Sequence, residues 1–220
     1  VQETTAWVND VAFYFKYNDL WGVIDFADHA TRAPDNVKKF PVFKAHYNDN
    51  IDYPKNFFPL GPVLTGHRPQ PYQLDFLLDN DFEYNPKSDF TCKQRPYAGA
   101  LERRQHVQSI ILEKFPNTDI NYRDWAIDFW KKHENKLGAI CVPGAVNNML
   151  DRGQAELMML GVCTISPRLP EILVNNIQLE PNKDYIVCAD DYSDLINIME
   201  SLSPEKAKEI GDNVKKKMND

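Results

Sequence analysis

The sequence predicts an α/β protein whose C-terminal part is a Rossmann-like domain built on a parallel sheet. Three short apolar runs, at residues 137–142, 162–166 and 185–189, are separated by segments with the pattern of helices and loops. Strand–helix–strand units usually form parallel sheets, because two parallel strands need a long crossover connection. We therefore expect these three runs to be strands of one parallel sheet.

The helix between the first two runs is the second indication. It begins near Asp151 and Arg152 and ends at Gly161. In parallel sheets, ligands collect at the carboxyl ends of strands and at the amino ends of the helices that follow. Arg152 and Glu156 are four residues apart, which puts them on one helix face. A cation and an acceptor at this place suit a phosphate and a sugar hydroxyl.

The other elements of this part follow from apolar periodicity and capping residues. A regular pattern begins near residue 89 and continues to the end of the chain. We expect a strand at 90–92, a helix at 101–115, a short strand or turn at 118–122, an aromatic amphipathic helix at 123–134, and helices at 193–201 and 204–218.

The first 87 residues have a different character, with many Asp, Asn, Pro and aromatic residues in short pieces. Aromatic and β-branched runs between turn residues fit strands or buried loops. These runs lie at 11–17, 23–26, 42–47 and 57–64, and the polar stretch 79–88 reads as a linker. We expect two domains: a smaller N-terminal lobe at 1–87, reduced or truncated, and the Rossmann-like domain at 88–220.

Composition limits the classes of function. The chain has 43% hydrophobic residues, enough for a packed core, and a formal net charge of −7. That acidic balance argues against a general polyanion binder and hence against nucleic acid as a partner, whereas a single nucleotide needs only a few local cations. No run reaches the ~18 apolar residues of a membrane span.

The four cysteines form no Cys-x-x-Cys pair, and each lies in or beside an apolar run. Buried free thiols are the favoured interpretation, since free Cys packs as a small hydrophobe. They are Cys92, Cys141, Cys163 and Cys188. Free thiols fit a reducing compartment, so we expect a cytoplasmic location, with targeting segments outside this chain left open.

Residues 130–190 resemble the donor-binding half of GT-B glycosyltransferases, as found in fucosyltransferase-like and exostosin-like families. The shared layout is a Lys before a strand, a Gly-containing loop, Arg-x-x-x-Glu on a helix that ends in Gly, and then a short strand. The matching residues are Lys136, Gly144, Arg152, Glu156 and Gly161.

This resemblance implies a glycosyltransferase that moves a sugar from a nucleoside diphosphate donor to a hydroxyl of a glycan or another acceptor. Glu156 would lie near the donor ribose, and Lys136 and Arg152 near its diphosphate. The resemblance also implies that no metal is essential, so we expect no cofactor beyond the nucleotide sugar as substrate.

A second basic cluster precedes and enters the helix at 101–115. In the first unit of the same family domain, a basic side chain often reaches the donor phosphates. Lys93, Arg95 and Arg104 are the candidates here, and Arg103 and Arg104, being adjacent on a helix, should point differently. A solvated helix face is the alternative for the two arginines.

The N-terminal part holds the candidate catalytic base. Asp28 and His29 follow a predicted strand, and His titrates near neutrality while Asp can orient it. Loop-capping polar residues are the alternative. Asp79 and Asp81 form the chain's Asp-x-Asp, which could hold Mg²⁺ or Mn²⁺ against a diphosphate but also fits an ordinary turn.

Three other interpretations stay open. Arg152 and Glu156 could form an exposed ion pair and nothing more. The protein could be a non-catalytic α/β binding module with a degenerate nucleotide site. A different nucleotide-using enzyme, such as a sugar-nucleotide epimerase or a methyltransferase, is disfavoured because the chain has no Gly-x-Gly-x-x-Gly.

Overall fold

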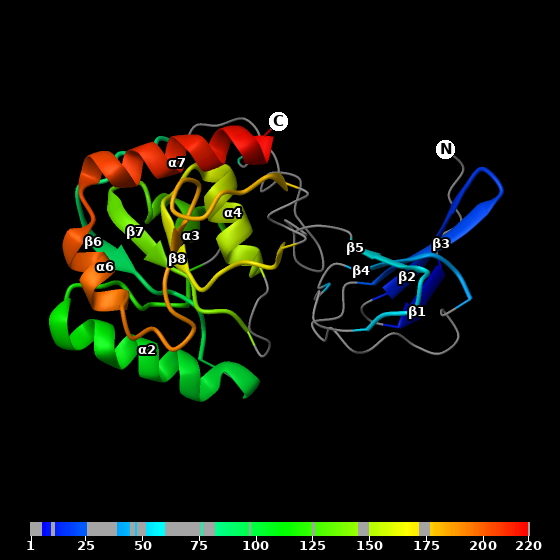
Figure 1. Ribbon diagram of the computed structural model, residues 1–220, viewed down its shortest axis with the longest axis horizontal. Coiled ribbons are helices and arrows are strands. Elements are labelled where there is room, and N and C mark those ends of the chain that lie inside the picture. The colour runs from blue at the N-terminus through cyan, green and yellow to red at the C-terminus, as the bar shows by residue number, and fades with distance from the viewer. Residues whose placement is uncertain are drawn as a thin grey trace.

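The structure is a computed structural model that describes residues 6–9, 12–25, 39–44, 47, 52–59, 76, 82–96, 98–124, 126–144, 150–171 and 177–219. The described strands form two sheets, one from each half of the chain (Figure 1). No helix in these ranges is long and apolar enough to cross a membrane.

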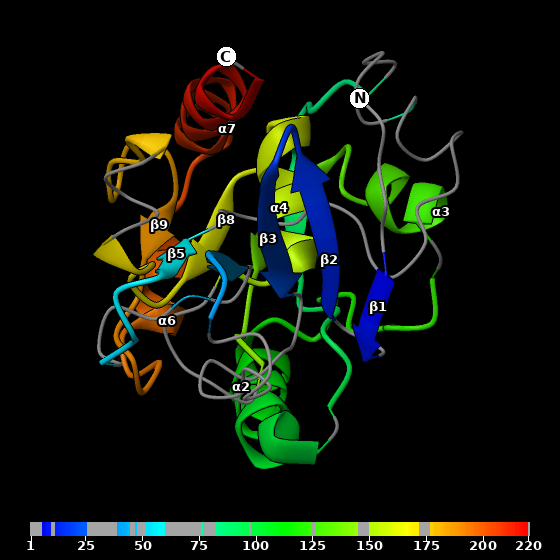
Figure 2. The ribbon, with the colours of Figure 1, turned by 90° about the vertical axis from the view of Figure 1, so that its right-hand side faces the viewer.

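The N-terminal sheet has five strands in the order β1-β2-β3-β4-β5. The first three pair antiparallel and lie side by side in Figure 2, whereas β3, β4 and β5 pair parallel. A turn at Asn18, whose φ is +52°, joins β2 to β3. The strands are β1 (Ala6–Asn9), β2 (Ala12–Tyr17), β3 (Leu20–Asp25), β4 (Val42–Lys44) and β5 (Phe57–Pro59).

One face of this sheet holds a small core of Val23, Val42 and Phe57. The register places Asp25 opposite Lys44, and the Lys44 ammonium lies 3.0 Å from the Asp25 carboxylate with both side chains buried. A buried ion pair therefore stands at the carboxyl ends of β3 and β4. Strands β2, β3, β4 and β5 overlap the predicted runs at 11–17, 23–26, 42–47 and 57–64, respectively, and β3 begins three residues before its run.

The C-terminal sheet has four strands in the order β6-β7-β8-β9, and all of its pairs are parallel. The strands are β6 (Ser88–Thr91), β7 (Lys136–Ile140), β8 (Thr164–Ser166) and β9 (Ile186–Val187). The three predicted runs thus form one parallel sheet, as expected, with β6 added at its edge. The mixed α/β fold with a parallel sheet is confirmed, and it is compatible with a Rossmann-like domain.

A short extended segment at Asp119 continues this sheet beyond β6. Asp119 pairs with Thr91 through an isolated parallel bridge, with Asp119 N donating to Phe90 O at 3.0 Å and Cys92 N donating to Asp119 O at 2.9 Å. After β6 the chain continues to Asp119, which pairs on one side of β6, and then to β7, which pairs on the other side. The order of the strands reverses between β6 and β7, which is a topological switch point.

Helices cover both faces of the sheet. The connection that follows β6 runs toward Asp119, whereas those that follow β7 and β8 run in the opposite direction along the sheet. In Figures 1 and 2, α2 and α7 lie on opposite sides of the strands. The elements are the 3₁₀ turn η2 (Ala98–Ala100), α2 (Leu101–Lys114), α3 (Ala126–Lys131), α4 (Arg152–Leu160), α6 (Leu195–Ser201) and α7 (Pro204–Asn219). The α3 helix is shorter than the predicted 123–134 segment, and turns occupy residues 132–135.

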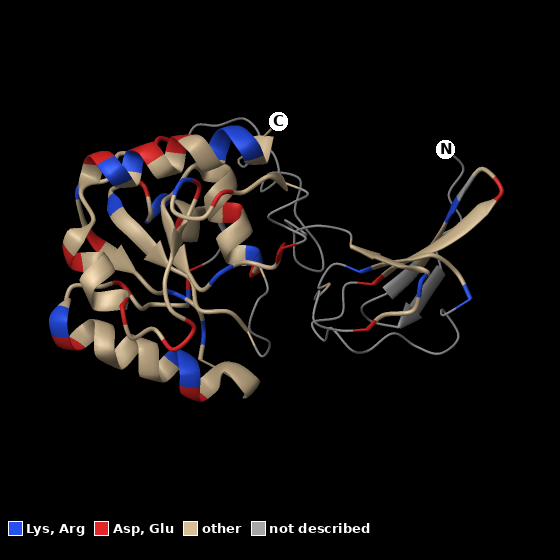
Figure 3. Ribbon diagram, in the orientation of Figure 1, with Lys and Arg blue, Asp and Glu red and all other residues tan. Residues whose placement is uncertain are grey.

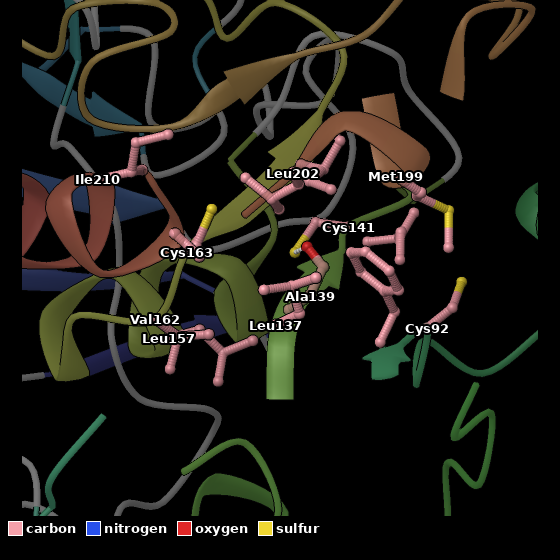
Figure 4. Close-up of a cluster of buried hydrophobic side chains, with 14 of the residues drawn as sticks. Cys92, Leu137, Ala139, Cys141, Leu157, Val162, Cys163, Met199, Leu202 and Ile210 are labelled. Atoms are coloured by element: carbon pink, nitrogen blue, oxygen red, sulfur yellow. Dashed lines mark hydrogen bonds between the residues drawn. The ribbon is translucent and has the colours of Figure 1, made fainter. Parts of the chain in front are cut away.

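The core of this domain lies between the sheet and its helices (Figure 4). Leu137 and Ala139 of β7 lie among Leu157 of α4, Met199 of α6 and Ile210 of α7. The four cysteines are free and buried, as expected. Burial raises the pKa of the Cys92 thiol to about 12, so this thiol stays protonated at neutral pH.

The α4 helix ends where α7 crosses it. Gly161 has φ +82° and closes α4, and a Cβ on Gly211 of α7 would lie 2.0 Å from the Gly161 carbonyl oxygen. Glycine is favoured at 161 by the left-handed conformation and is required at 211 by the close approach of the two helices. The contact packs the carboxyl end of α4 directly against α7.

The polar stretch 82–87 belongs to the C-terminal domain rather than to a linker. Phe82 and Tyr84 are buried in the main core, and the Tyr84 hydroxyl donates to Leu137 O at 2.9 Å. Asn85 N donates to Glu134 O at 2.7 Å. Alternating aromatic residues that face the core explain why a polar sequence packs here, and the expected linker is wrong for this part.

Candidate functional site

The candidate site lies at the carboxyl edge of the parallel sheet. Strands β6, β7, β8 and β9 end at Thr91, Ile140, Ser166 and Val187, so the segments that follow them meet at one edge. The switch point puts the loops after β6 (92–96) and β7 (141–144) on either side of the position where ligands bind in such sheets. Several predicted donor-site residues are found here.

Arg104 connects these two loops. Its side chain is buried, and it donates from Nη1 to Arg95 O at 2.8 Å and from Nε to Val142 O at 3.1 Å. Its Nη2 lies 3.2 Å from Oδ2 of Asp151, at the start of α4. The guanidinium therefore joins three segments of the carboxyl edge with its own donors.

The neighbouring Arg103 reaches the same loop. Its Nη2 donates to Pro143 O at 3.2 Å and also to Gly144 O. The two adjacent arginines thus converge on the segment after β7, and only Arg104 is buried. Gly144 is half-buried, and a Cβ placed there would meet nothing within 4 Å, so this position does not require glycine.

Asp151 begins α4 as its N-cap. Its Oδ1 accepts a hydrogen bond from Gly153 N at 2.9 Å, while Oδ2 pairs with Arg104. Arg152 is the first helical residue, and its side chain is 58% exposed. The cation predicted for a phosphate is thus solvent-accessible, at the positive end of a helix dipole.

Glu156 lies one turn further along α4, with its side chain only 11% exposed. Its Oε2 accepts from the Trp130 indole N–H at 3.0 Å, and its Oε1 lies 3.4 Å from Arg152 Nε. Burial raises the pKa of Glu156 to about 7, although the Trp130 and Arg152 contacts favour its ionised form. Arg152 and Glu156 do form the predicted pair, and the carboxylate is its buried member.

Lys93 is more enclosed than the sequence suggests. Its ammonium lies 2.6 Å from Asp119 Oδ2 and 2.6 Å from Asp124 Oδ2, and its side chain is 1% exposed. Burial opposes ionisation of Asp119, but the hydrogen bond and charge of Lys93 outweigh this and lower the Asp119 pKa. Two carboxylates of the same chain thus neutralise the Lys93 cation.

Arg95 and Arg168 are exposed at the same edge, on the loops after β6 and β8. The Arg95 guanidinium lies 5.9 Å from the centre of the Tyr122 ring. With Arg152 after β7, an exposed arginine follows each of the first three strands of the sheet. Asp190 and Asp191, both exposed, follow β9.

Lys136 is at the opposite edge. It is the first residue of β7, and its ammonium lies 3.6 Å from Asp89 Oδ2. A strand of five residues spans roughly 16 Å at about 3.3 Å per residue, so Lys136 does not join Arg152 and Gly144 in one site. The order of residues along the chain matched the family layout, but strand direction separates them.

The catalytic base and the alternative metal ligands predicted from the sequence lie outside the described residues. These are Asp28, His29, Asp79 and Asp81. Within the described ranges, no group of three or more His, Cys, Asp and Glu side chains is arranged to hold a metal ion.

Sequence reasoning missed three contributors to this edge. Trp130 holds Glu156, Asp151 links the α4 cap to Arg104, and Arg168 adds an exposed cation after β8. The helix-capping preference of Asp before a predicted helix could have singled out Asp151. No local pattern pairs Trp130 with Glu156, because they are 26 residues apart.

Chemically, the edge offers exposed guanidinium groups and one nearly buried carboxylate with hydrogen-bonding capacity. This combination can bind a phosphorylated ligand that also carries hydroxyls. In comparisons with known proteins, the chain matched no protein-family model and no curated protein.

Proposed function

We propose that the C-terminal domain binds a nucleoside diphosphate sugar at the carboxyl edge of its parallel sheet and transfers the sugar to a hydroxyl acceptor. The observation that carries the proposal is Arg152, an exposed cation in the first turn of a nine-residue helix that begins beside the topological switch point. Anions bind at such helix ends because backbone N–H groups and the helix dipole both favour negative charge.

Arg152 would contact the diphosphate, and Arg95 and Arg168 would add positive charge around it. These cations would act in catalysis by stabilising the negative charge that builds on the diphosphate as the sugar departs. Glu156 would accept hydrogen bonds from the ribose hydroxyls through Oε1, which lies 3.4 Å from Arg152 Nε and is the less firmly held of its oxygens. Asp28 and His29 remain the proposed acceptor-side base.

One observation favours a second candidate, the non-catalytic α/β binding module. Lys93 and Arg104, which the resemblance would assign to the donor phosphates, are buried and paired with carboxylates of their own chain. Cations that are paired with carboxylates of their own chain are not free to stabilise the negative charge on a leaving group. Such a module would bind nucleotides weakly and would not release free sugar or transfer it.

Titration calorimetry with nucleoside diphosphates of all common bases, followed by a donor-hydrolysis screen, tests the proposal. At least one diphosphate should bind, and Arg152→Ala should weaken it by about tenfold or more, the value of one charge-assisted contact. Glu156→Gln should reduce binding of the ribonucleotide while changing binding of its 2′,3′-dideoxy analogue little.

Lys217→Gln is a matched control, because Lys217 also forms ion pairs but with residues at the amino edge of the sheet. Its ammonium is 2.6 Å from Asp184 Oδ2 and 2.9 Å from Glu180 Oε1, just before β9 begins. This control should bind nucleotide like the parent. Parent-like affinity in Arg152→Ala would instead reject the proposal, and binding without hydrolysis or transfer would favour the non-catalytic module.

A further inference from the structure

Arg104 occupies a special place at the proposed site. It lies on α2, the helix that follows β6, yet its side chain contacts the loop after β6, the loop after β7 and the start of α4. These are the segments on both sides of the topological switch point. The guanidinium provides donors in a fixed planar arrangement, so one side chain can satisfy acceptors from three segments at once.

The Asp151 carboxylate links Arg104 to the first turn of α4. One oxygen caps α4 through Gly153 N at 2.9 Å, and the other pairs with Arg104 at 3.2 Å. The carboxylate cannot rotate toward Arg104 or away from it without changing the cap. The residue that follows it in sequence is Arg152, so the position of the first turn determines where that cation lies.

We propose that Arg104 is a positioning residue: through Asp151 it holds the first turn of α4 so that Arg152 meets the diphosphate. This inference rests on the proposed function, since it concerns the same site. It differs from the role that the family resemblance gives to Arg104, which is direct contact with a phosphate. Burial and three acceptors from its own chain leave the Arg104 guanidinium engaged within the protein.

The two roles predict different results in a double-mutant cycle. Arg104→Gln and Asp151→Asn should each weaken binding of the tightest nucleoside diphosphate, by about tenfold for the first. The Asn side chain retains an oxygen for the cap but loses the charge. If Arg104 acts through Asp151, the double variant should bind about as the weaker single variant does. If Arg104 touches the phosphate, the two losses should multiply.

A second cycle separates positioning from general stability. In the Arg104→Gln background, Arg152→Ala should cost much less affinity than it does in the parent, because Arg152 is already displaced. A purely structural role would lower the melting temperature and leave the affinity of the folded protein, and its dependence on Arg152, unchanged. Lys217→Gln, a change in ion pairs remote from the edge, should leave the affinity and its dependence on Arg152 unchanged.

Amide hydrogen exchange at Gly153 tests the connection without nucleotide. Exchange should accelerate in Arg104→Gln and in Asp151→Asn, which is the milder variant if Arg104→Gln fails to fold. Folded variants with parent-like exchange and parent-like affinity would overturn the positioning role. So would affinity losses that multiply in the Arg104 and Asp151 double variant. Either result would leave the proposed function intact. A parent protein that binds no nucleoside diphosphate would reject the proposed function, and the positioning role with it, even if Gly153 exchange responds.

Discussion

The two sheets of this protein bury charge in different ways. The N-terminal sheet has a small apolar core of Val23, Val42 and Phe57, and beside it a fully buried Asp25–Lys44 pair. The C-terminal sheet lies within a much larger apolar core, and its buried charged groups, Lys93, Arg104, Glu156 and Asp184, lie beside the ends of the strands. In both sheets buried charge lies at strand ends, but in the first it adjoins a core of only three buried apolar residues, whereas in the second it borders a much larger core.

The difference shows what each sheet depends on. A small core supplies little hydrophobic stabilisation. The free-energy cost of an unpaired buried charge would therefore be a large fraction of the total stability. In the C-terminal half, burial of apolar side chains dominates, and the charges at the sheet edge contribute a smaller fraction of the stability. Lysines and acidic residues are interspersed along α7 (Figure 3), in pairs such as Lys206–Glu209.

The largest expected effect is on the N-terminal sheet. Lys44→Met would leave Asp25 buried without its ammonium partner and should destabilise this sheet by about 3–5 kcal/mol. Hydrogen exchange of the Val23 and Val42 amides, which donate to Pro41 O and Asn56 O, measures the change. Exchange at Ala139 and Cys141 in the other sheet should stay parent-like, as expected if the two sheets are stabilised separately.

The matched control for this prediction is the double variant Asp25→Asn, Lys44→Met, in which neither partner is charged. It should recover much of the lost protection, since the cost comes from an uncompensated charge. Equal loss in the single and double variants would show that packing of the Lys44 stem, rather than its charge, supports the sheet.

A smaller effect concerns acid sensitivity of the C-terminal domain. His133 is buried, its Nδ1 lies 2.7 Å from Phe129 O, and burial lowers its pKa to about 4. The unfolded chain binds a proton below about 6.5 while the folded protein does not, so stability falls as the pH drops from about 6.5 to 4, by on the order of 3 kcal/mol. His133→Asn should remove this loss, as measured by urea unfolding at several pH values.

The smallest effect concerns Glu156 and has the opposite sign. Because burial raises its pKa to about 7, the folded protein retains a proton that the unfolded chain releases above about 4.5. The contribution of Glu156 to the free energy of unfolding therefore falls as the pH rises from about 4.5 to 7, and it stays low above pH 7. Glu156→Gln should match the parent near pH 4.5 and exceed it at pH 8 by about 1–2 kcal/mol, less than the full shift because Arg152 is exposed.

These two groups oppose each other between about pH 4.5 and 6.5, so the parent curve should be flatter there than that of either variant. In His133→Asn the free energy of unfolding should show the pH dependence due to Glu156 alone. In Glu156→Gln it should show the pH dependence due to His133 alone. Slopes that do not change in this way would mean that neither group is desolvated as the structure indicates.

The parallel sheet of the C-terminal half and the helix capped by Asp151 could be predicted from the sequence. Apolar runs of strand length, a capping residue and a glycine stop are local signals, and the structure reproduces them in β7, β8, β9 and α4. The proximity of Arg152 and Glu156 was also predictable, because helical periodicity alone places residues four apart on one face.

Which cations are available at the carboxyl edge could not be predicted from the sequence. Lys93, Arg104, Lys136 and Arg152 are similar in sequence terms, yet the first two are buried in ion pairs, the third is at the opposite edge, and only Arg152 is exposed beside the switch point. Their partners are as much as 47 residues away in sequence. Burial and strand direction depend on the packing of the whole sheet, and so no local pattern records them.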